Sequence, residues 1–199
     1  MKKTMLMFLS LGMIVLLGLV VYLVFFLPGS NTMHPVDQRD RMGPSMMHRT
    51  GSFVNNEYEF LAHMIPHHEE AIFTANILKE NTESEEMIQF AERIIISQSE
   101  EIEKMKTWLT TWYPDKDHQI DYQPMMRDLE GLKGEELDIA FLEDMIPHHM
   151  EAIMMSQQLL SRGLAEHEEI AELARAIRND QLDEIHMMRN MLNTKGGES

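Results

Sequence analysis

Residues 60–68 read FLAHMIPHH, and residues 141–149 read FLEDMIPHH. The second stretch begins 81 positions after the first (141 − 60), and both continue with Glu-Ala-Ile, at residues 70–72 and 151–153. Self-similarity at a fixed interval indicates a duplicated structural unit. The chain therefore carries two copies of one motif that combines methionine, histidine and acidic residues.

The duplication extends to a second pattern downstream of each motif. The pattern Q-x-x-E-I-x-x-M occupies residues 98–105 and returns at residues 181–188, an interval of 83 positions (181 − 98). This interval exceeds that of the first motif by two, so the internal turn of the second copy is longer by two residues. We therefore expect each copy to form a helix, a short turn and another helix.

Apolar residues at helical spacing predict four helices, and no stretch alternates for long enough to predict a strand. The expected helices cover about residues 55–79, 85–111, 135–162 and 165–193. Asn55 or Asn56 can cap the first helix, and Thr82 or Ser84 can cap the second, because their side chains accept hydrogen bonds from free backbone N–H groups. Gly163 supplies a stop for the third helix.

The segment between the two copies is long enough to return along a helical bundle. Repeat 1 spans residues 55–111, the crossover spans residues 112–134, and repeat 2 spans residues 135–193. Two helical hairpins joined by one long crossover predict an all-α, ferritin-like antiparallel four-helix bundle. We expect this bundle to occupy residues 55–199.

A proline interrupts the first motif of each copy. Pro66 and Pro147 each remove a backbone donor and clash with the carbonyl one turn earlier, which predicts a kinked helix. The alternative is that each proline opens a separate helix at its first position. Both interpretations place an irregularity directly before the histidine pairs at residues 67–68 and 148–149.

An uncharged stretch near the N-terminus predicts a membrane anchor. Residues 5–27 contain no charge and are long enough to cross a bilayer as a helix. Lys2 and Lys3 precede the stretch, which predicts a cytoplasmic N-terminus. The alternative is a cleavable signal peptide, and either interpretation exports the rest of the chain. We expect residues 1–27 to be a single-pass transmembrane helix in the cell membrane, with the C-terminal domain extracytoplasmic.

The next segment, residues 28–54, reads as a linker because it is rich in glycine and proline and has no apolar period. Methionine and histidine cluster within it, at Met33, His34, Met42, Met46, Met47 and His48. We consider that this cluster can gather copper ions loosely.

Composition leaves thioether and imidazole as the soft ligands of this chain. Cysteine is absent, whereas methionine contributes 20 of the 199 residues. A thioether suits Cu(I), but methionine is also a common filler of helical cores, and both interpretations stay open. The net charge of −16 argues against nucleic acid as a partner, because phosphate backbones are bound by basic surfaces.

Helical spacing predicts which side chains of the motifs face the interior. His68 and His149 fall in the middle of the apolar stripes of their helices. The other interior positions are predicted for two glutamines and four methionines: Gln98, Gln181, Met64, Met105, Met145 and Met188. The shoulders of the stripes are predicted to hold six further polar residues: His63, His67, Asp144, His148, Glu101 and Glu184.

Side chains at i and i+4 converge on one helix face, and this spacing relates His63 to His67 and Asp144 to His148. Met64 and His68 have the same spacing, as do Met145 and His149. A single buried histidine is usually a hydrogen-bonded core residue, and Gln98 and Gln181 can serve as its partners. Four histidines in two adjacent pairs favour a metal site instead. The fourteen candidate ligands and ligand-orienting residues are those named in the preceding paragraph.

These residues resemble a ferritin-like bacterial family known only as domain of unknown function 305. Its hallmark is a phenylalanine, then an acid followed by Met-Ile-Pro-His-His, and downstream Gln-x-x-Glu-Ile-x-x-Met. The second copy matches throughout, whereas the first has His63 where the acid is expected. The resemblance covers about residues 55–193 and implies an exported or membrane-anchored four-helix bundle associated with copper handling. It implies no established enzyme activity.

The favoured function is an exported protein that binds, buffers or passes on copper, as Cu(I) or Cu(II). A structural or sensor module without a metal is the alternative. A di-metal oxidase is a weaker alternative, because such sites contain Glu-x-x-His where this chain has Gln-x-x-Glu. The predicted partners are the metal ion and, through the N-terminal helix, the membrane. A homo-oligomer or a copper-handling partner protein is left open.

Overall fold

The computed structural model describes residues 53–117 and 120–195 of the chain. These residues form four α-helices and no strand: α2 (Glu57–Asn81), α3 (Glu85–Trp112), α4 (Gly134–Ser161) and α5 (Glu168–Lys195). The prediction of an all-α fold with four helices is confirmed. None of these four helices is apolar enough over sufficient length to cross a membrane. The predicted anchor at residues 1–27, and the linker as far as residue 52, lie outside the described residues.

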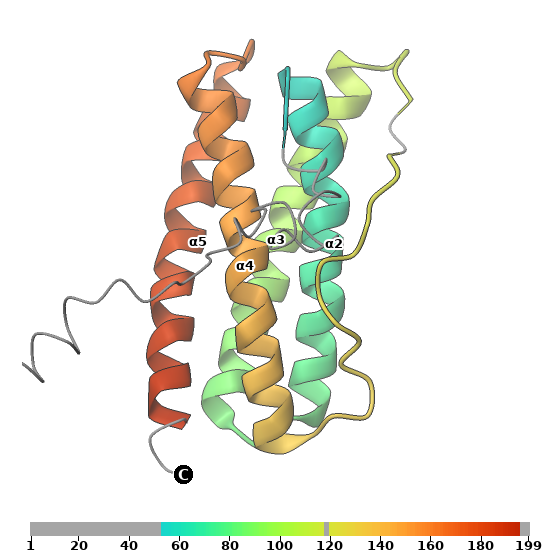
Figure 1. Ribbon diagram of the computed structural model, residues 1–199. Coiled ribbons are helices and arrows are strands. Elements are labelled where there is room, and N and C mark those ends of the chain that lie inside the picture. Colours follow the sequence, from blue (N-terminus) through green and yellow to red (C-terminus); the bar gives the residue numbers. More distant parts are fainter. Residues whose placement is uncertain (1–52, 118–119, 196–199) are drawn as a thin grey trace, which may run out of the picture. The chain divides into compact units, whose positions relative to one another are not determined.

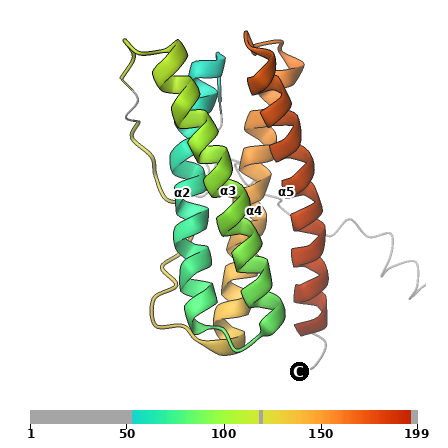
Figure 2. The same cartoon turned by 180° about the vertical axis from the view of Figure 1, so that it is seen from behind.

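The helices form two hairpins, α2 with α3 and α4 with α5, and the hairpins meet where α2 packs against α4. The crossover between α3 and α4 starts at one end of the bundle and returns along α2 to the other end (Figure 1). Seen from behind, α3 and α5 lie on the near side (Figure 2). The crossover therefore runs along one face of the bundle, and α3 and α5 form the opposite face.

Side-chain caps fix the starts of α2 and α3. The side chain of Asn56 accepts a hydrogen bond from the backbone N–H of Glu59, at 2.8 Å, and Ser84 accepts one from Met87, at 3.4 Å. Each cap satisfies a backbone donor that the first turn leaves free. Both residues were among the predicted caps. At the end of α4, Gly163 adopts a φ of +61°, the left-handed conformation that favours glycine after a helix.

The start of α5 differs from the prediction by three residues. The carboxylate of Glu57, in the first turn of α2, accepts hydrogen bonds from the backbone N–H groups of Glu166 and His167. The carbonyl of His167 then accepts the first helical hydrogen bonds, from Ile170 and Ala171. Because a side chain distant in sequence caps α5, local propensity alone places the helix start too early.

Both prolines of the motifs lie inside continuous helices. α2 includes Pro66, and α4 includes Pro147. The alternative in which each proline opens a separate helix is therefore wrong. A proline removes only its own N–H from the helical ladder, and the long flanking segments pack against the other helices.

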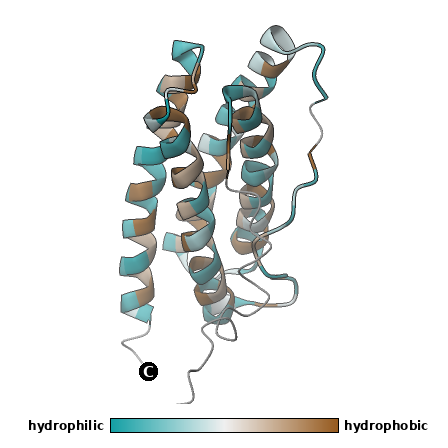
Figure 3. Cartoon of the chain, turned by 45° about the horizontal axis from the view of Figure 1, so that its top comes forward, coloured by the Kyte–Doolittle hydropathy of each residue, from teal (hydrophilic) through white to brown (hydrophobic). Residues whose placement is uncertain are grey.

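Every helix carries both apolar and polar residues along its length (Figure 3). The buried apolar residues form two clusters, one toward each end of the bundle. One cluster contains the C-terminal half of α2, the N-terminal half of α3, the N-terminal half of α4 and the C-terminal half of α5. The other contains the four complementary halves. The histidine pairs of the motifs, at residues 67–68 and 148–149, belong to neither cluster and lie between them along α2 and α4.

Candidate metal centre

A layer of buried polar side chains separates the two apolar clusters. We call these residues the histidine layer: His67 and His68 of α2, Gln98 of α3, His148 and His149 of α4, and Gln181 of α5. All six are at most 3% exposed. Each histidine pair lies near the middle of its helix. The antiparallel hairpins therefore bring the corresponding residues of the two repeats to the same height in the bundle.

The two repeats meet at His67 and His148. Their ring centroids are 3.7 Å apart, with an interplanar angle of 31°. The Nε2 atom of His67 donates a hydrogen bond to the backbone carbonyl of His148, at 3.1 Å. We predicted both residues on the shoulders of their helices, but they are 1% and 0% exposed. The prediction of a shoulder position was wrong because α2 and α4 pack on each other at that face.

The other two histidines each pair with a glutamate of the same repeat. His68 Nε2 lies 2.8 Å from Glu101 Oε2, and His149 Nε2 lies 2.6 Å from Glu184 Oε2. A carboxylate only accepts, so Nε2 carries the proton in both rings. The Nδ1 atoms of these rings therefore hold the lone pair in the neutral form.

Among the described residues, the Nδ1 atoms of the layer have no hydrogen-bond partner. This applies to all four histidines: His67, His68, His148 and His149. Gln98 Oε1 and both polar atoms of the Gln181 side chain are also buried without a partner among the described residues. An unpaired buried polar atom costs roughly 1–3 kcal/mol. The interpretation of a hydrogen-bonded core requires the glutamines to form hydrogen bonds with the Nδ1 atoms of the histidines. The described residues contain no such bonds.

Burial keeps the central pair of histidines neutral. Loss of solvation, followed by the nearby histidines, holds the pKa of His67 well below its ordinary value. Burial likewise lowers the pKa of His148 to about 4, although Glu70 opposes the shift. Both imidazoles therefore keep an unprotonated nitrogen at neutral pH.

Glu70 is a residue of this centre that the sequence-based candidates omitted. Its Oε2 lies 3.3 Å from His148 Nε2, without hydrogen-bond geometry, and its side chain is 9% exposed. Its carboxylate also accepts hydrogen bonds from the Tyr122 hydroxyl and from the backbone N–H groups of Met125 and Met126. Burial raises the pKa of Glu70, but these contacts outweigh burial and lower it. The repeated Glu-Ala-Ile after each motif was the signal that could have identified this glutamate.

Two predicted candidates interact with groups outside the layer. Asp144 binds Arg127 of the crossover, with Nε at 2.8 Å and Nη2 at 2.7 Å, and accepts the Arg127 backbone N–H at 2.9 Å. His63 is half-buried, burial lowers its pKa, and the charges of Glu59 and Glu151 act on it. The i, i+4 spacing therefore does not unite Asp144 with His148, since Arg127 competes for the carboxylate.

The four candidate methionines are all fully buried. Met64 and Met105 belong to one apolar cluster, and Met145 and Met188 belong to the other. Each repeat therefore contributes its two thioethers to one side of the histidine layer. Their interior position agrees with the prediction, and their role as ligands stays a prediction.

The histidines of the layer are arranged in pairs, His67 with His148 and the other two each with a glutamate. Within residues 53–117 and 120–195, no three side chains of histidine, aspartate or glutamate are grouped closely enough to hold a metal ion. The chemistry of the donors nevertheless suits a transition metal, because neutral imidazole binds copper, zinc, iron and nickel, and thioether binds soft ions such as Cu(I).

Residues 57–192 match the family described as Domain of unknown function (DUF305). This chain belongs to the DUF305 family. The resemblance predicted from the two motifs is thereby confirmed. Comparison with curated proteins gave no match.

Solved structures of DUF305 proteins and of CopM share the fold. CopM in its Cu(I)-bound form is 30% identical with a TM-score of 0.61, and covers 70% of this chain and 96% of its own. CopM in its Cu(II)-bound form is 29% identical with a TM-score of 0.63, covering 71% and 99%. A DUF305 fragment from Deinococcus radiodurans is 27% identical with a TM-score of 0.63, covering 71% and 97%.

Proposed function

We propose that this DUF305 protein binds copper through the histidine layer and buffers it or passes it on outside the cytoplasm. The observation that carries the proposal is the set of four buried Nδ1 atoms that lack a partner in the described part of the chain, contributed equally by the two repeats. Leaving these atoms unpaired destabilises the protein without metal. A bound metal ion removes this cost, because it gives the Nδ1 lone pairs a partner.

The protonation of the rings supports the same role. Three of the four histidines donate Nε2–H to an oxygen, two of them to a carboxylate. A metal-binding histidine usually donates its other N–H to a carboxylate or a carbonyl, which orients the ring and raises its basicity. Glu101 and Glu184 accordingly orient His68 and His149, and the Nδ1 atoms of these two rings bind the metal without releasing a proton.

The choice of copper rests on ligand softness and on the relatives. The chain offers imidazole and thioether, which accept Cu(I) and, through imidazole, Cu(II). CopM, whose fold this chain shares, has been solved in Cu(I)-bound, Cu(II)-bound and silver-bound forms. Met64, Met105, Met145 and Met188 are the thioethers available on the two sides of the layer.

The location of the protein is part of the proposal. Residues 5–27 are uncharged and preceded by two lysines, which supports a single membrane span with a cytoplasmic N-terminus. The absence of cysteine suits an exported copper protein, because thioethers persist where thiols are oxidised.

Titration with Cu(I) in competition with a coloured chelator tests the proposal on the full-length chain in mild detergent. We expect tight stoichiometric binding that falls with His67→Ala/His68→Ala or His148→Ala/His149→Ala, and disappears when both pairs are replaced. The linker variant His34→Ala/His48→Ala removes two imidazoles elsewhere and is the matched control. It should keep the tight sites.

The opposite pattern would refute this function. If the variant without the four layer histidines still competes with the chelator as the unmodified chain does, copper is bound elsewhere. Circular dichroism of each variant shows whether the helices are retained.

A further inference from the structure

The two faces of the bundle give unequal access to the histidine layer. On one face, the crossover closes over the α2–α4 contact. Glu70 accepts the N–H groups of Met125 and Met126, at 2.8 and 2.9 Å, and the hydroxyl of Tyr122. The ring of Tyr122 stands edge-on to that of His67, with centroids 6.4 Å apart. The crossover thus lies directly against the central histidine pair.

Further contacts fix the crossover in this position. The Thr74 hydroxyl donates to Met126 Sδ at 3.2 Å, and the Leu129 side chain is only 1% exposed. Arg127 binds Asp144 of α4 through two side-chain nitrogens. Anchored to both α2 and α4, the crossover blocks a direct path from solvent to the layer on this face.

The opposite face exposes the carboxylates that bind the layer. The side chains of Glu101 and Glu184 are 13% and 14% exposed, whereas His68 and His149, to which they are bonded, are 0% exposed. Each glutamate therefore connects solvent with a fully buried imidazole. The Nδ1 atom of each imidazole lies on the same ring and is buried, without a hydrogen-bond partner among the described residues.

A third acid joins these two. Asp180 precedes Glu184 by one turn of α5 and is exposed, and the charges of Glu101 and Glu184 both act on it. Farther along the same face, α3 and α5 leave a groove of about 420 Å³ lined by Gln89, Arg93 and Met187, among others. A larger groove of about 640 Å³ lies beside the crossover, lined by Arg127, Asp128 and the N-terminal half of α4. The two faces therefore differ in their contacts with the layer and not in groove size.

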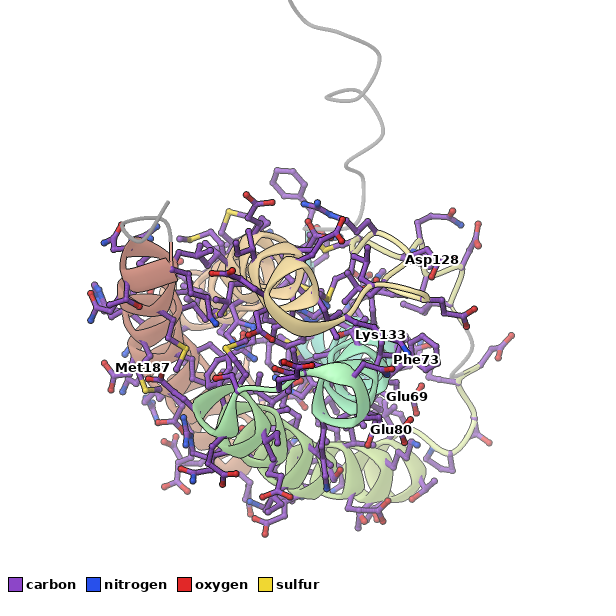
Figure 4. All side chains as sticks on the ribbon, turned by 90° about the horizontal axis from the view of Figure 1, so that it is seen from below. Glu69, Phe73, Glu80, Asp128, Lys133 and Met187 are labelled. Atoms are coloured by element: carbon purple, nitrogen blue, oxygen red, sulfur yellow. The ribbon has the colours of Figure 1, made fainter. Side chains whose placement is uncertain are left out.

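We infer that copper reaches and leaves the histidine layer through the α3–α5 face, where Glu101, Asp180 and Glu184 attract the cation. The inference rests on the proposed function. Negative charge at the mouth of a low-dielectric site raises the local concentration of cations and their association rate. Figure 4 shows Met187 of α5 and Asp128 of the crossover on opposite sides of the bundle. These two sides are the alternatives to be distinguished.

Uptake kinetics on the full-length chain test the route. Cu(I) is transferred from a weak coloured chelator in a stopped-flow instrument at low ionic strength. Asp180→Asn should lower the uptake rate constant by about two- to fivefold, Asp180→Lys should lower it further, and added salt should reduce both differences. The final copper stoichiometry should be unchanged, because Asp180 is not proposed as a ligand.

Asp128→Asn is the matched control, since it makes the same charge change at an exposed residue on the crossover face. It should leave the rate constant unchanged. Equal slowing by Asp128→Asn and Asp180→Asn, or no slowing by Asp180→Lys, would overturn the route while leaving copper binding intact. Failure of the unmodified chain to bind copper would overturn the proposed function and the route together.

Discussion

Neighbouring oxygen atoms determine which ring nitrogen carries the proton in three buried imidazoles. His67, His68 and His149 each have an acceptor oxygen at Nε2, so the proton lies there and the lone pair lies at Nδ1. The sequence predicted the inward position of His68 and His149 from the apolar stripe. It could not predict the proton positions, because these depend on glutamates of the partner helix and on a backbone carbonyl across the hairpins.

Acid should destabilise the metal-free protein before most carboxylates titrate. The pKa of His148 is about 4 in the folded state, against roughly 6.5 in the unfolded chain. The unfolded state therefore binds more protons as pH falls, and stability present above about pH 6.5 is lost progressively toward pH 4. The loss from His148 is on the order of 2–4 kcal/mol, and His67 adds to it.

Urea denaturation at several pH values between 7 and 4.5 measures this loss. The variant His148→Gln lacks one of the titrating groups and should lose less stability over the same interval. Equal losses in both proteins would show that His148 does not titrate as its surroundings require.

The start of a helix was predictable where neighbouring residues cap it, and was misplaced where a residue distant in sequence caps it. Asn56 and Ser84 cap α2 and α3 as expected, because capping depends on neighbours within three residues. The start of α5 was misplaced, since Glu57 provides its cap from another hairpin. The crossover has no apolar period, so its attachment to Glu70 and Asp144 gave no signal in the sequence.

Removing the cap that Glu57 provides should destabilise the bundle. Glu57 is 1% exposed and also accepts hydrogen bonds from the Tyr113 hydroxyl and from His167 Nδ1. Glu57→Ala removes the buried acceptor of these hydrogen bonds and should lower the free energy of unfolding by roughly 3 kcal/mol.

Thermal and urea denaturation check this value, with Glu86→Ala as the control. Glu86 is exposed in the first turn of α3, and its loss should cost less than about 1 kcal/mol. Similar effects of the two substitutions would contradict the role assigned to Glu57.

The whole bundle is organised around one polar layer between two apolar clusters. The sequence repeat predicted that both halves contribute histidines, and the rings of His67 and His148 meet with their centroids 3.7 Å apart. The crossover breaks the equivalence of the halves, because it binds Glu70 on one side and Asp144, through Arg127, on the other. The crossover occurs only once in the sequence, so the comparison of the two repeats could not predict where it binds.

The central claim is that the four Nδ1 atoms of the histidine layer bind copper. Nitrogen-15 NMR of the histidine rings, on the full-length chain with and without Cu(I), tests it most directly. We predict that His67, His68 and His149 carry their proton on Nε2 without metal, and that Cu(I) shifts the Nδ1 signals of all four layer histidines. Protons found on Nδ1 without metal, or shifts confined to His63, His167 and His186, would contradict it.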